Sequence, residues 1–383
     1  MKKSLIALAF GTLGLGIAEF VMMGILPDVA SELKISLPQA GHFISAYALG
    51  VCVGAPALIS VRKYSLKKIL LLLVSLIMAG NLCTALAPNY LLMLAGRFLS
   101  GLPHGAYFGV ASITAGKLAD KGKGSEAVAI MVAGMTIANL FGVPLGTALS
   151  TTLSWRATFF LVCLWGIVTF SAIRYWVPPV ASLPDTGLRG QFRFLKSPAP
   201  WLILAATMLG NGGIFCWYSY INPLLTHVSG FQPESITGFM VLAGLGMVVG
   251  NLAGGRLSDR YTPGKVAAWA QGITCFALPA IFFFAHISWL SVLLMCLCTA
   301  CLFAISSPQQ VSIIRYSQGG EMLGAGGVQI AFNLGNALGA YIGGIVLYHG
   351  YSYPALFGLP LVLSGFILQI IFCKKYEHKE YFF

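Results

Sequence analysis

The chain has 383 residues, of which 57% are hydrophobic and only 9% carry a formal charge. Soluble domains contain roughly 25% charged residues, so a water-soluble protein of this length could not cover its surface with so few. The composition excludes a soluble enzyme or a soluble binding module and predicts a protein whose apolar surface faces lipid. The 45 glycines agree with this, because small residues let membrane helices pack closely.

Twelve apolar stretches follow one another, each close to the roughly 20 residues that a helix needs to cross a bilayer. Such continuous runs exclude a β-barrel, whose strands are short and alternating. Lys2 and Lys3 before an apolar run resemble a signal peptide, but the run is long and contains Glu19, so we expect it to stay as the first span. The predicted spans are 4–27, 38–60, 67–87, 89–112, 125–149, 154–177, 201–225, 235–257, 264–285, 287–310, 321–348 and 352–373.

The basic residues predict the orientation. Of the 23 Lys and Arg residues, all except Lys34, Arg97 and Arg156 fall in loops or helix ends on one side of these spans. Basic loops stay in the cytoplasm, so we expect both termini to be cytoplasmic in a bacterial inner membrane. The net charge of +12 then reflects loops that face anionic lipid and does not indicate nucleic acid.

The chain also reads as an internal duplication. The fifth and eleventh spans align at one offset, with Gly134, Ile137, Ala138, Gly142, Leu145 and Gly146 over Gly327, Ile330, Ala331, Gly335, Leu338 and Gly339. Gly54 likewise aligns with Gly250. We therefore predict an all-α membrane protein with two six-helix bundles, 1–178 and 201–383, joined by a cytoplasmic linker over 179–200. Repeated halves are typical of transporters, which bind substrate between the repeats near the middle of the membrane.

Several motifs carry a family resemblance. They are Gly14–Phe20, Met23–Pro27, Gly50–Pro56, Gly96–Gly101, Pro103–Ala106, Gly142–Gly146, Trp155-Arg156 and, after the eighth span, Gly255–Arg260. They resemble the major facilitator superfamily and, within it, the twelve-helix drug:proton antiporters. The resemblance implies proton-coupled efflux of a small molecule by alternating access. A sugar or sugar-like substrate is our first interpretation and a multidrug exporter the alternative; a channel or a membrane sensor is the alternative of another class.

Two formally charged side chains lie deep in the predicted hydrocarbon region, Glu19 and Arg97. Such groups are costly there and default to a functional role. At 1.5 Å per residue the two lie at similar depths, so we expect them to pair or to share a wet cavity. A carboxylate that alternates between wet and dry surroundings binds and releases a proton. His104 shares a helical face with Arg97 and is a candidate proton relay, although a structural histidine satisfied by a carbonyl is as good an explanation.

Two polar stripes are candidates for substrate binding. The seventh span carries Asn211, Phe215, Tyr218 and Asn222, and the eleventh carries Gln329, Asn333 and Asn336. Amides facing lipid are expensive, so both stripes should face protein or a cavity. We expect the two helices to face each other across a central cavity, with hydrogen-bond glue between helices as the alternative.

Two sets of residues are candidates for gating. Gly142, Pro144 and Gly146 match the antiporter signature of the family, which implies a tight contact of the fifth helix; a generic proline kink is the alternative. Asp259 and Arg260 close the loop motif, and we expect Asp259 to lie in the turn after the eighth span and to complement a helix N-terminus. The equivalent stretch of the first half, 61–68, contains no acid.

No cofactor is expected, since the proton gradient would supply the energy, and the expected partners are substrate, protons and lipid, with a monomeric chain. Eight of the nine cysteines lie well inside apolar spans, and the ninth, Cys373, closes the last span. Cys298 and Cys301 have a metal-like spacing but no neighbouring histidines, and thiols are ordinary packing residues in apolar helices. We therefore expect no metal site. No nucleophile, metal set or carboxylate pair predicts an enzyme.

Overall fold

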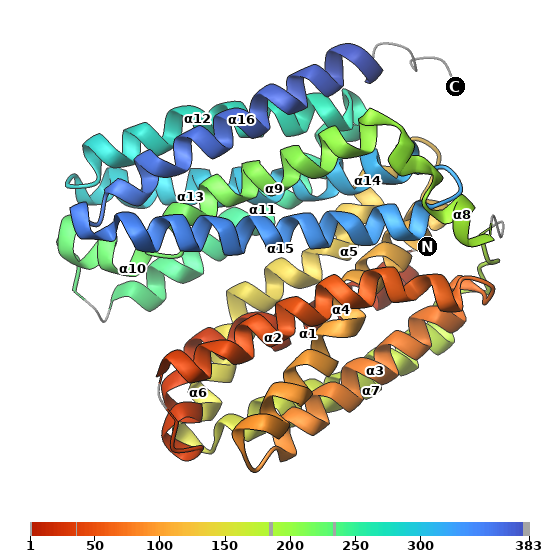
Figure 1. Ribbon diagram of the computed structural model, residues 1–383, viewed down its shortest axis with the longest axis horizontal. Coiled ribbons are helices and arrows are strands. Elements are labelled where there is room, and N and C mark those ends of the chain that lie inside the picture. Colours follow the sequence, from red (N-terminus) through yellow and green to blue (C-terminus); the bar gives the residue numbers. More distant parts are fainter. Residues whose placement is uncertain (1, 36, 184–186, 233–234, 378–383) are drawn as a thin grey trace. The chain divides into compact units, whose positions relative to one another are not determined.

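The computed structural model describes residues 2–35, 37–183, 187–232 and 235–377, and these residues form helices and contain no strand (Figure 1). The helices are α1 (Lys2–Glu32), α2 (Leu37–Ala57), α3 (Leu66–Leu86), α4 (Tyr90–Leu118), α5 (Gly124–Ile137), α6 (Val143–Thr152), α7 (Trp155–Trp176), α8 (Gly187–Gln191), α9 (Pro198–Tyr218), α10 (Ile221–Pro223), α11 (Ile236–Arg260), α12 (Pro263–Phe284), α13 (Ser288–Ala304), α14 (Ser306–Tyr316), α15 (Glu321–Val346) and α16 (Tyr353–Tyr376). Short 3₁₀ turns occupy Leu58–Val61, Arg193–Lys196 and Leu347–His349, and π-helical turns occupy Ala138–Gly142 and Leu224–Val228.

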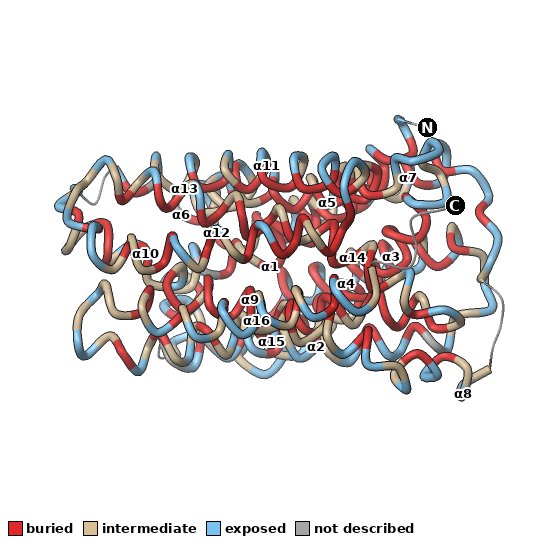
Figure 2. The backbone as a smooth tube through the Cα atoms, turned by 90° about the horizontal axis from the view of Figure 1, so that it is seen from above, coloured by how far each residue is buried: buried red, intermediate tan, exposed pale blue. Residues whose placement is uncertain are grey.

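The helices confirm the predicted membrane architecture. Within the described residues, ten helical stretches are long and apolar enough to cross a membrane, and α2 supplies a shorter apolar stretch, His42–Ala57. The twelfth is α4, which has 29 residues and is therefore about 43 Å long. It is less apolar because it contains Arg97 and His104. Figure 2 and the burial of its side chains show why this is tolerated: α4 is enclosed by protein over most of its length.

Three of the predicted spans are interrupted, and each interruption precedes a proline. Proline lacks an N–H and cannot bond the carbonyl four residues before it. Pro144 therefore leaves one carbonyl of the π turn Ala138–Gly142 without its usual amide partner, and in this turn the Val143 amide bonds to the Ala138 carbonyl. Pro223 follows the end of α9, and Pro308 follows the break between α13 and α14.

Close contacts between chain segments divide the structure into two compact units. The first contains Met1–Phe194 and Ser317–Ile330, and the second contains Leu195–Tyr316 and Ala331–Phe383. The first part of α15 is therefore grouped with the first unit. The predicted division of the sequence at a linker over 179–200 stays a prediction.

Glycines let helices approach so closely that a methyl group would not fit. A Cβ on Gly54 of α2 would lie 1.8 Å from the Leu102 carbonyl oxygen of α4. In the second unit, a Cβ on Gly250 of α11 would lie 1.9 Å from the Ala300 carbonyl oxygen of α13. The two glycines that align in the sequence thus perform the same packing task, each within its own unit.

The aligned fifth and eleventh spans repeat a second packing contact. A Cβ on Gly142 would lie 2.4 Å from Ile17 of α1, and one on Gly335 would lie 2.2 Å from the Met208 carbonyl oxygen of α9. The fifth helix packs on the first in one unit, and the eleventh packs on the seventh in the other. These paired contacts support the internal duplication read from the sequence.

We expect Gly54→Ala and Gly250→Ala to destabilise the protein to similar extents, because each added methyl would force backbone apart. Overpacking of this kind costs about 1–3 kcal/mol. Gly116→Ala is the control, since nothing lies within 4 Å of its Cβ position. Thermal unfolding in detergent measures all three variants. Equal stability of the two core variants and the control would contradict the packing described here.

Candidate functional site

Arg97 of α4 is completely buried and is held by backbone carbonyls of two other helices. Its Nε donates to the Phe43 carbonyl of α2 at 3.3 Å, and one terminal nitrogen donates to the Ala18 carbonyl of α1 at 2.7 Å. The guanidinium carbon lies 4.5 Å from the centre of the Tyr47 ring, a cation–π geometry. Arg97 therefore ties α1, α2 and α4 together at one level.

Glu19 of α1 lies beside His104 of α4. The Glu19 side chain is 11% exposed, and its Oε2 is 3.7 Å from His104 Nδ1 without completing a hydrogen bond. Within 4.0 Å, the described residues contain no ion pair between Glu19 and Arg97. The sequence left open a direct pair or a shared wet cavity; the direct ion pair is not formed between these described residues, and the wet cavity stays a prediction. Arg97 Nε and one terminal nitrogen bond to backbone carbonyls, one of which belongs to the residue before Glu19, while the other terminal nitrogen is buried without a hydrogen bond.

Tyr47 of α2 completes this cluster and was missed in the sequence. Its hydroxyl lies 2.9 Å from His104 Nδ1 and 3.5 Å from the Leu15 carbonyl oxygen. The side chain is 2% exposed. A phenol among apolar residues looks like ordinary packing. The sequence feature that could have identified Tyr47 is the glycine-rich stretch Gly50–Gly54 shortly after it, because these glycines pack this part of α2 against α4.

The His104 ring is fixed by its neighbours and is fully buried. It stacks on Phe108 with ring centres 5.2 Å apart and meets the Tyr47 ring edge-on. The Gln329 side chain comes close to it, but His104 Nε2 completes no hydrogen bond of good geometry. Gln329 therefore lies in the first unit, beside the histidine. The sequence grouped it with the polar stripe of the eleventh span.

The gating candidates of the fifth span lie against α1. A Cβ on Gly146 would lie 2.4 Å from Val21, and the Gly146 carbonyl accepts a hydrogen bond from Thr158 at 2.9 Å. Gly142 meets Ile17 in the same way, and Pro144 follows the π turn. The predicted tight contact of this helix is present, and the proline accompanies a π turn in the helix.

The polar stripe of the seventh span is only partly continuous. Asn211 is 3% exposed, and Phe215 meets Tyr218 and Phe332 of α15 edge-on, each at 5.9 Å between ring centres. Asn222 is exposed and lies in α10, beyond the end of α9. Because the regular helix ends at Tyr218, the 4-3-4 spacing no longer places Asn222 on the same face.

The helices α9 and α15 touch directly in the second unit. A Cβ on Gly339 would lie 2.0 Å from the Gly212 carbonyl oxygen. Beside this contact, Asn333 is 9% exposed and Asn336 is half-buried, with a carbonyl oxygen that lacks a hydrogen bond. At this level the two helices are packed together, where the sequence suggested a cavity between them.

Asp259 is not placed as the sequence suggested. It lies in the last turn of α11, which ends at Arg260, and the exposed Arg260 side chain lies over the Tyr261 ring at 5.6 Å. The N-terminus of α12 is complemented by Glu377, which directly follows the last residue of α16. It accepts hydrogen bonds from the Gly264 amide at 2.7 Å and the Thr262 hydroxyl at 2.8 Å.

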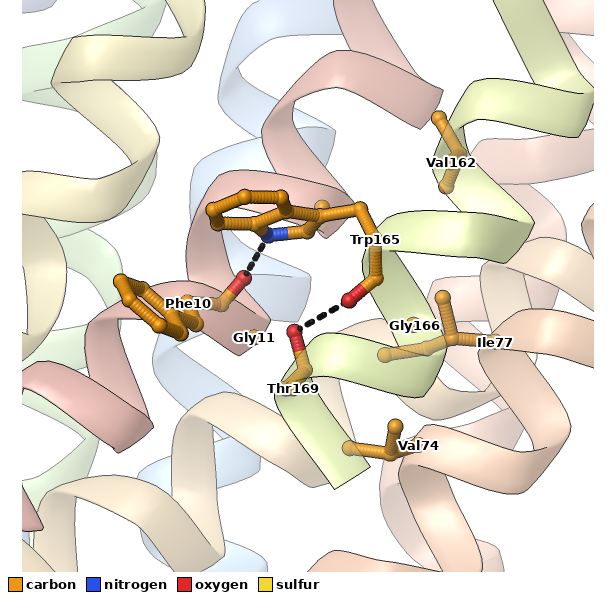
Figure 3. Close-up of a pocket in the computed structure, with 9 residues that line it drawn as sticks. Phe10, Gly11, Val74, Ile77, Val162, Trp165, Gly166 and Thr169 are labelled. Atoms are coloured by element: carbon orange, nitrogen blue, oxygen red, sulfur yellow. Dashed lines mark hydrogen bonds between the residues drawn. The ribbon is translucent and has the colours of Figure 1, made fainter. Parts of the chain in front are cut away.

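A small hollow lies between α1, α3 and α7 (Figure 3), and no residue of the Glu19 cluster lines it. Its lining is apolar except for Trp165 and Thr169, and both of these are satisfied: Trp165 Nε1 donates to the Phe10 carbonyl and the Thr169 hydroxyl to the Trp165 carbonyl, each at 2.9 Å. It contains no ionisable group, so it offers neither a proton site nor a polar substrate site.

Twelve membrane helices, repeated packing in two halves and an ionisable cluster enclosed within the helices define a membrane transport protein. The model of the Major Facilitator Superfamily matches residues 8–327. The chain belongs to this family, whose members are transporters and not enzymes.

Individual relatives agree with this assignment. AraJ of Escherichia coli (strain K12) is 50% identical over 99% of this chain and 97% of its own length. A chloramphenicol resistance protein of Streptomyces lividans is 29% identical over 91% of this chain and 90% of its own. A probable sugar efflux transporter of Helicobacter pylori (strain G27) is 27% identical over 97% of this chain and 94% of its own. The crystal structure of the fucose:proton symporter FucP of E. coli aligns with a TM-score of 0.75 at 16% identity, over 96% of this chain and 98% of that one, and shows the same fold.

Arg97→Lys should not replace the arginine. A single ammonium cannot reproduce the two directed bonds to carbonyls on different helices, and a buried hydrogen bond to a charged group contributes about 1.5–3 kcal/mol. We expect a loss of thermal stability of that order and at least a roughly tenfold loss of transport. Arg189→Lys, at an exposed position of α8, is the matched control. Wild-type behaviour of the Arg97 variant would show that the fork geometry is dispensable.

Glu377→Gln should weaken the junction of α12 and α16, because an amide accepts less strongly from the Gly264 N–H and Thr262 hydroxyl. A lost cap costs about 1 kcal/mol, and we expect a loss of stability of that order in thermal unfolding. Asp259→Asn provides the comparison, since the sequence had assigned the capping role to that acid. A larger loss at Asp259 than at Glu377 would reverse the assignment made from the structure.

Proposed function

We propose that this protein exports a sugar or sugar-like small molecule by proton antiport across the bacterial inner membrane. The observation that carries the proposal is the Glu19 cluster: a carboxylate in the middle of a membrane helix, with one oxygen lacking a hydrogen bond and a histidine 3.7 Å away. An intramembrane acid of this kind is costly unless it binds a proton or a partner. In this proposal Glu19 is the coupling acid, and the proton gradient is the only energy source, with no cofactor.

The cluster also supports separate roles for its other members. Arg97 fixes the backbone beside Glu19 through the Ala18 carbonyl. His104 is the relay, since its Nδ1 faces both the carboxylate and the Tyr47 hydroxyl. The hydroxyl can donate to Nδ1 or turn towards the Leu15 carbonyl, so Tyr47 sets which partner His104 has. Tyr47 is therefore a positioning residue for proton transfer.

The sugar assignment rests on the polar and aromatic side chains of the second unit. Asn211, Asn333 and Asn336 offer amides, and Phe215 and Tyr218 offer ring faces on which a pyranose can stack. The name of the H. pylori relative supports a sugar cargo. The S. lividans relative is slightly more similar in sequence to this chain than the H. pylori relative, and its name supports a drug exporter as the second candidate. Aromatic surfaces suit a drug-like molecule equally.

Gating and orientation complete the proposal. The close contact of Gly142 and Gly146 with α1, with the π turn before Pro144, supports a seal that limits proton leak. Asp259 and Arg260 are proposed to bias the gate from the end of α11. The distribution of basic residues supports cytoplasmic termini, and we propose a monomer with bundles at 1–178 and 201–383.

Glu19→Gln should abolish uphill export and preserve downhill exchange, because the amide cannot carry a proton. The test uses purified protein in proteoliposomes with an imposed pH gradient, a panel of sugars and drugs, and flux measured in both directions. Glu32→Gln is the matched control, since this acid lies at the end of the same helix in an ion pair with Arg156. Wild-type accumulation by the Glu19 variant would exclude Glu19 as the coupling acid. Uphill export of drugs but not sugars would favour the second candidate.

A further inference from the structure

One corner of the first unit gathers cations from three helices. It is the end of the bundle where α1 and α3 begin and α7 ends. The basic residues in these segments are Lys2, Lys3, Arg62, Lys63, Lys67, Lys68 and Arg174. Lys2, Lys3, Lys63, Lys68 and Arg174 are exposed. We call this set the basic corner.

Three hydrogen bonds hold the corner together. The Lys67 ammonium donates to the Arg174 carbonyl at 2.7 Å, which joins α3 to α7. The Ser4 hydroxyl donates to the Trp176 carbonyl at 2.6 Å, which brings the first turn of α1 to the same place. The Leu66 amide donates to the Val180 carbonyl at 3.2 Å. The cations are therefore positioned by folded structure.

The segments that build this corner supply no acid. Residues 1–18, 33–119 and 127–184 contain neither Asp nor Glu. Lys67 and Arg174 are close enough for their like charges to interact unfavourably. A concentration of positive charge at a membrane surface is stabilised by an anionic group from outside the protein.

The surroundings indicate which anion this is. Tyr175 and Trp176 are 82% and 41% exposed beside Arg174, and Tyr64 is 57% exposed before α3, as is typical of side chains at the lipid interface. Further into the membrane, Leu72 and Val168 are 51% and 46% exposed. Leu72 follows Lys68 by one helical turn, so a molecule with a charged head and an apolar tail would meet cations first and hydrocarbon below.

We propose that the basic corner binds the phosphate headgroup of an anionic phospholipid whose acyl chain lies along the exposed faces of α3 and α7. Lys68 and Arg174 are the principal contacts, while Lys67 holds the two helices at the spacing that the headgroup needs. The site is separate from the Glu19 cluster. The leaflet follows from the orientation proposed above, and binding itself does not depend on it.

The test is native mass spectrometry of the full chain in detergent, titrated with phosphatidylglycerol or with phosphatidylcholine of the same acyl chains. The variant is Lys68→Gln with Arg174→Gln, which leaves the Lys67 bond in place. Each basic residue near an anionic surface contributes a similar binding free energy, and the double variant removes two such residues. We therefore expect it to bind phosphatidylglycerol roughly 10- to 30-fold more weakly.

The matched control is Lys121→Gln with Lys123→Gln, which removes the same charge from the α4–α5 loop beside Asp120 and should bind like wild type. Lys68→Arg with Arg174→Lys keeps the charge and should also bind. If the loop control bound phosphatidylglycerol as weakly as the double variant, the effect would be one of net charge, and the proposed site would be wrong. Equal binding of both lipids to the wild type, or a loss in the charge-keeping variant, would also overturn the site. Complete displacement by equimolar glycerol 3-phosphate would assign the corner to a soluble phosphate and overturn the lipid.

Discussion

A guanidinium inside a bilayer must find its hydrogen-bond partners within the protein, and the first unit is organised around this constraint. Arg97 donates to carbonyls of α1 and α2 and places its charge against the Tyr47 ring, although one of its terminal nitrogens has no hydrogen-bond partner. These contacts fix the level of Glu19, which follows the bonded Ala18 carbonyl, and of His104, which shares the Tyr47 hydroxyl. The described ionisable groups are held near one another without a direct ion pair between Glu19 and Arg97, and one oxygen of the Glu19 carboxylate has no hydrogen bond.

Much of this arrangement was predictable, because the bilayer leaves few choices. Lengths of apolar runs predicted twelve spans, and helix rise placed Glu19 and Arg97 at similar depths. The partners of Arg97 were not predictable, since backbone carbonyls leave no mark in a side-chain sequence. Glu377 was not predicted to cap α12, because it is separated from Gly264 by 113 positions in the sequence. Asp259 was predicted instead, because it lies close to this turn in the sequence.

The helix interruptions were also predictable only in part. Pro144, Pro223 and Pro308 each follow an interruption by the spacing that a missing amide requires, so these breaks could have been proposed from sequence. Yet Pro103 and Pro279 lie inside helices that continue. A proline shows where one backbone hydrogen bond is absent, and the packing around it determines whether the helix is interrupted there. That packing depends on neighbours far away in the chain.

The glycine contacts have a mechanical consequence. Where α2 lies against α4, and α11 against α13, the carbonyls of one helix occupy the place of the other's side chains, so neither helix can slide without collision. Each pair behaves as a stiff beam. Compliance is then left to the stretches with irregular hydrogen bonding, such as Ala138–Gly142 and Leu224–Val228. We therefore expect conformational change in this protein to be taken up more easily at these irregular turns than within the closely packed helix pairs.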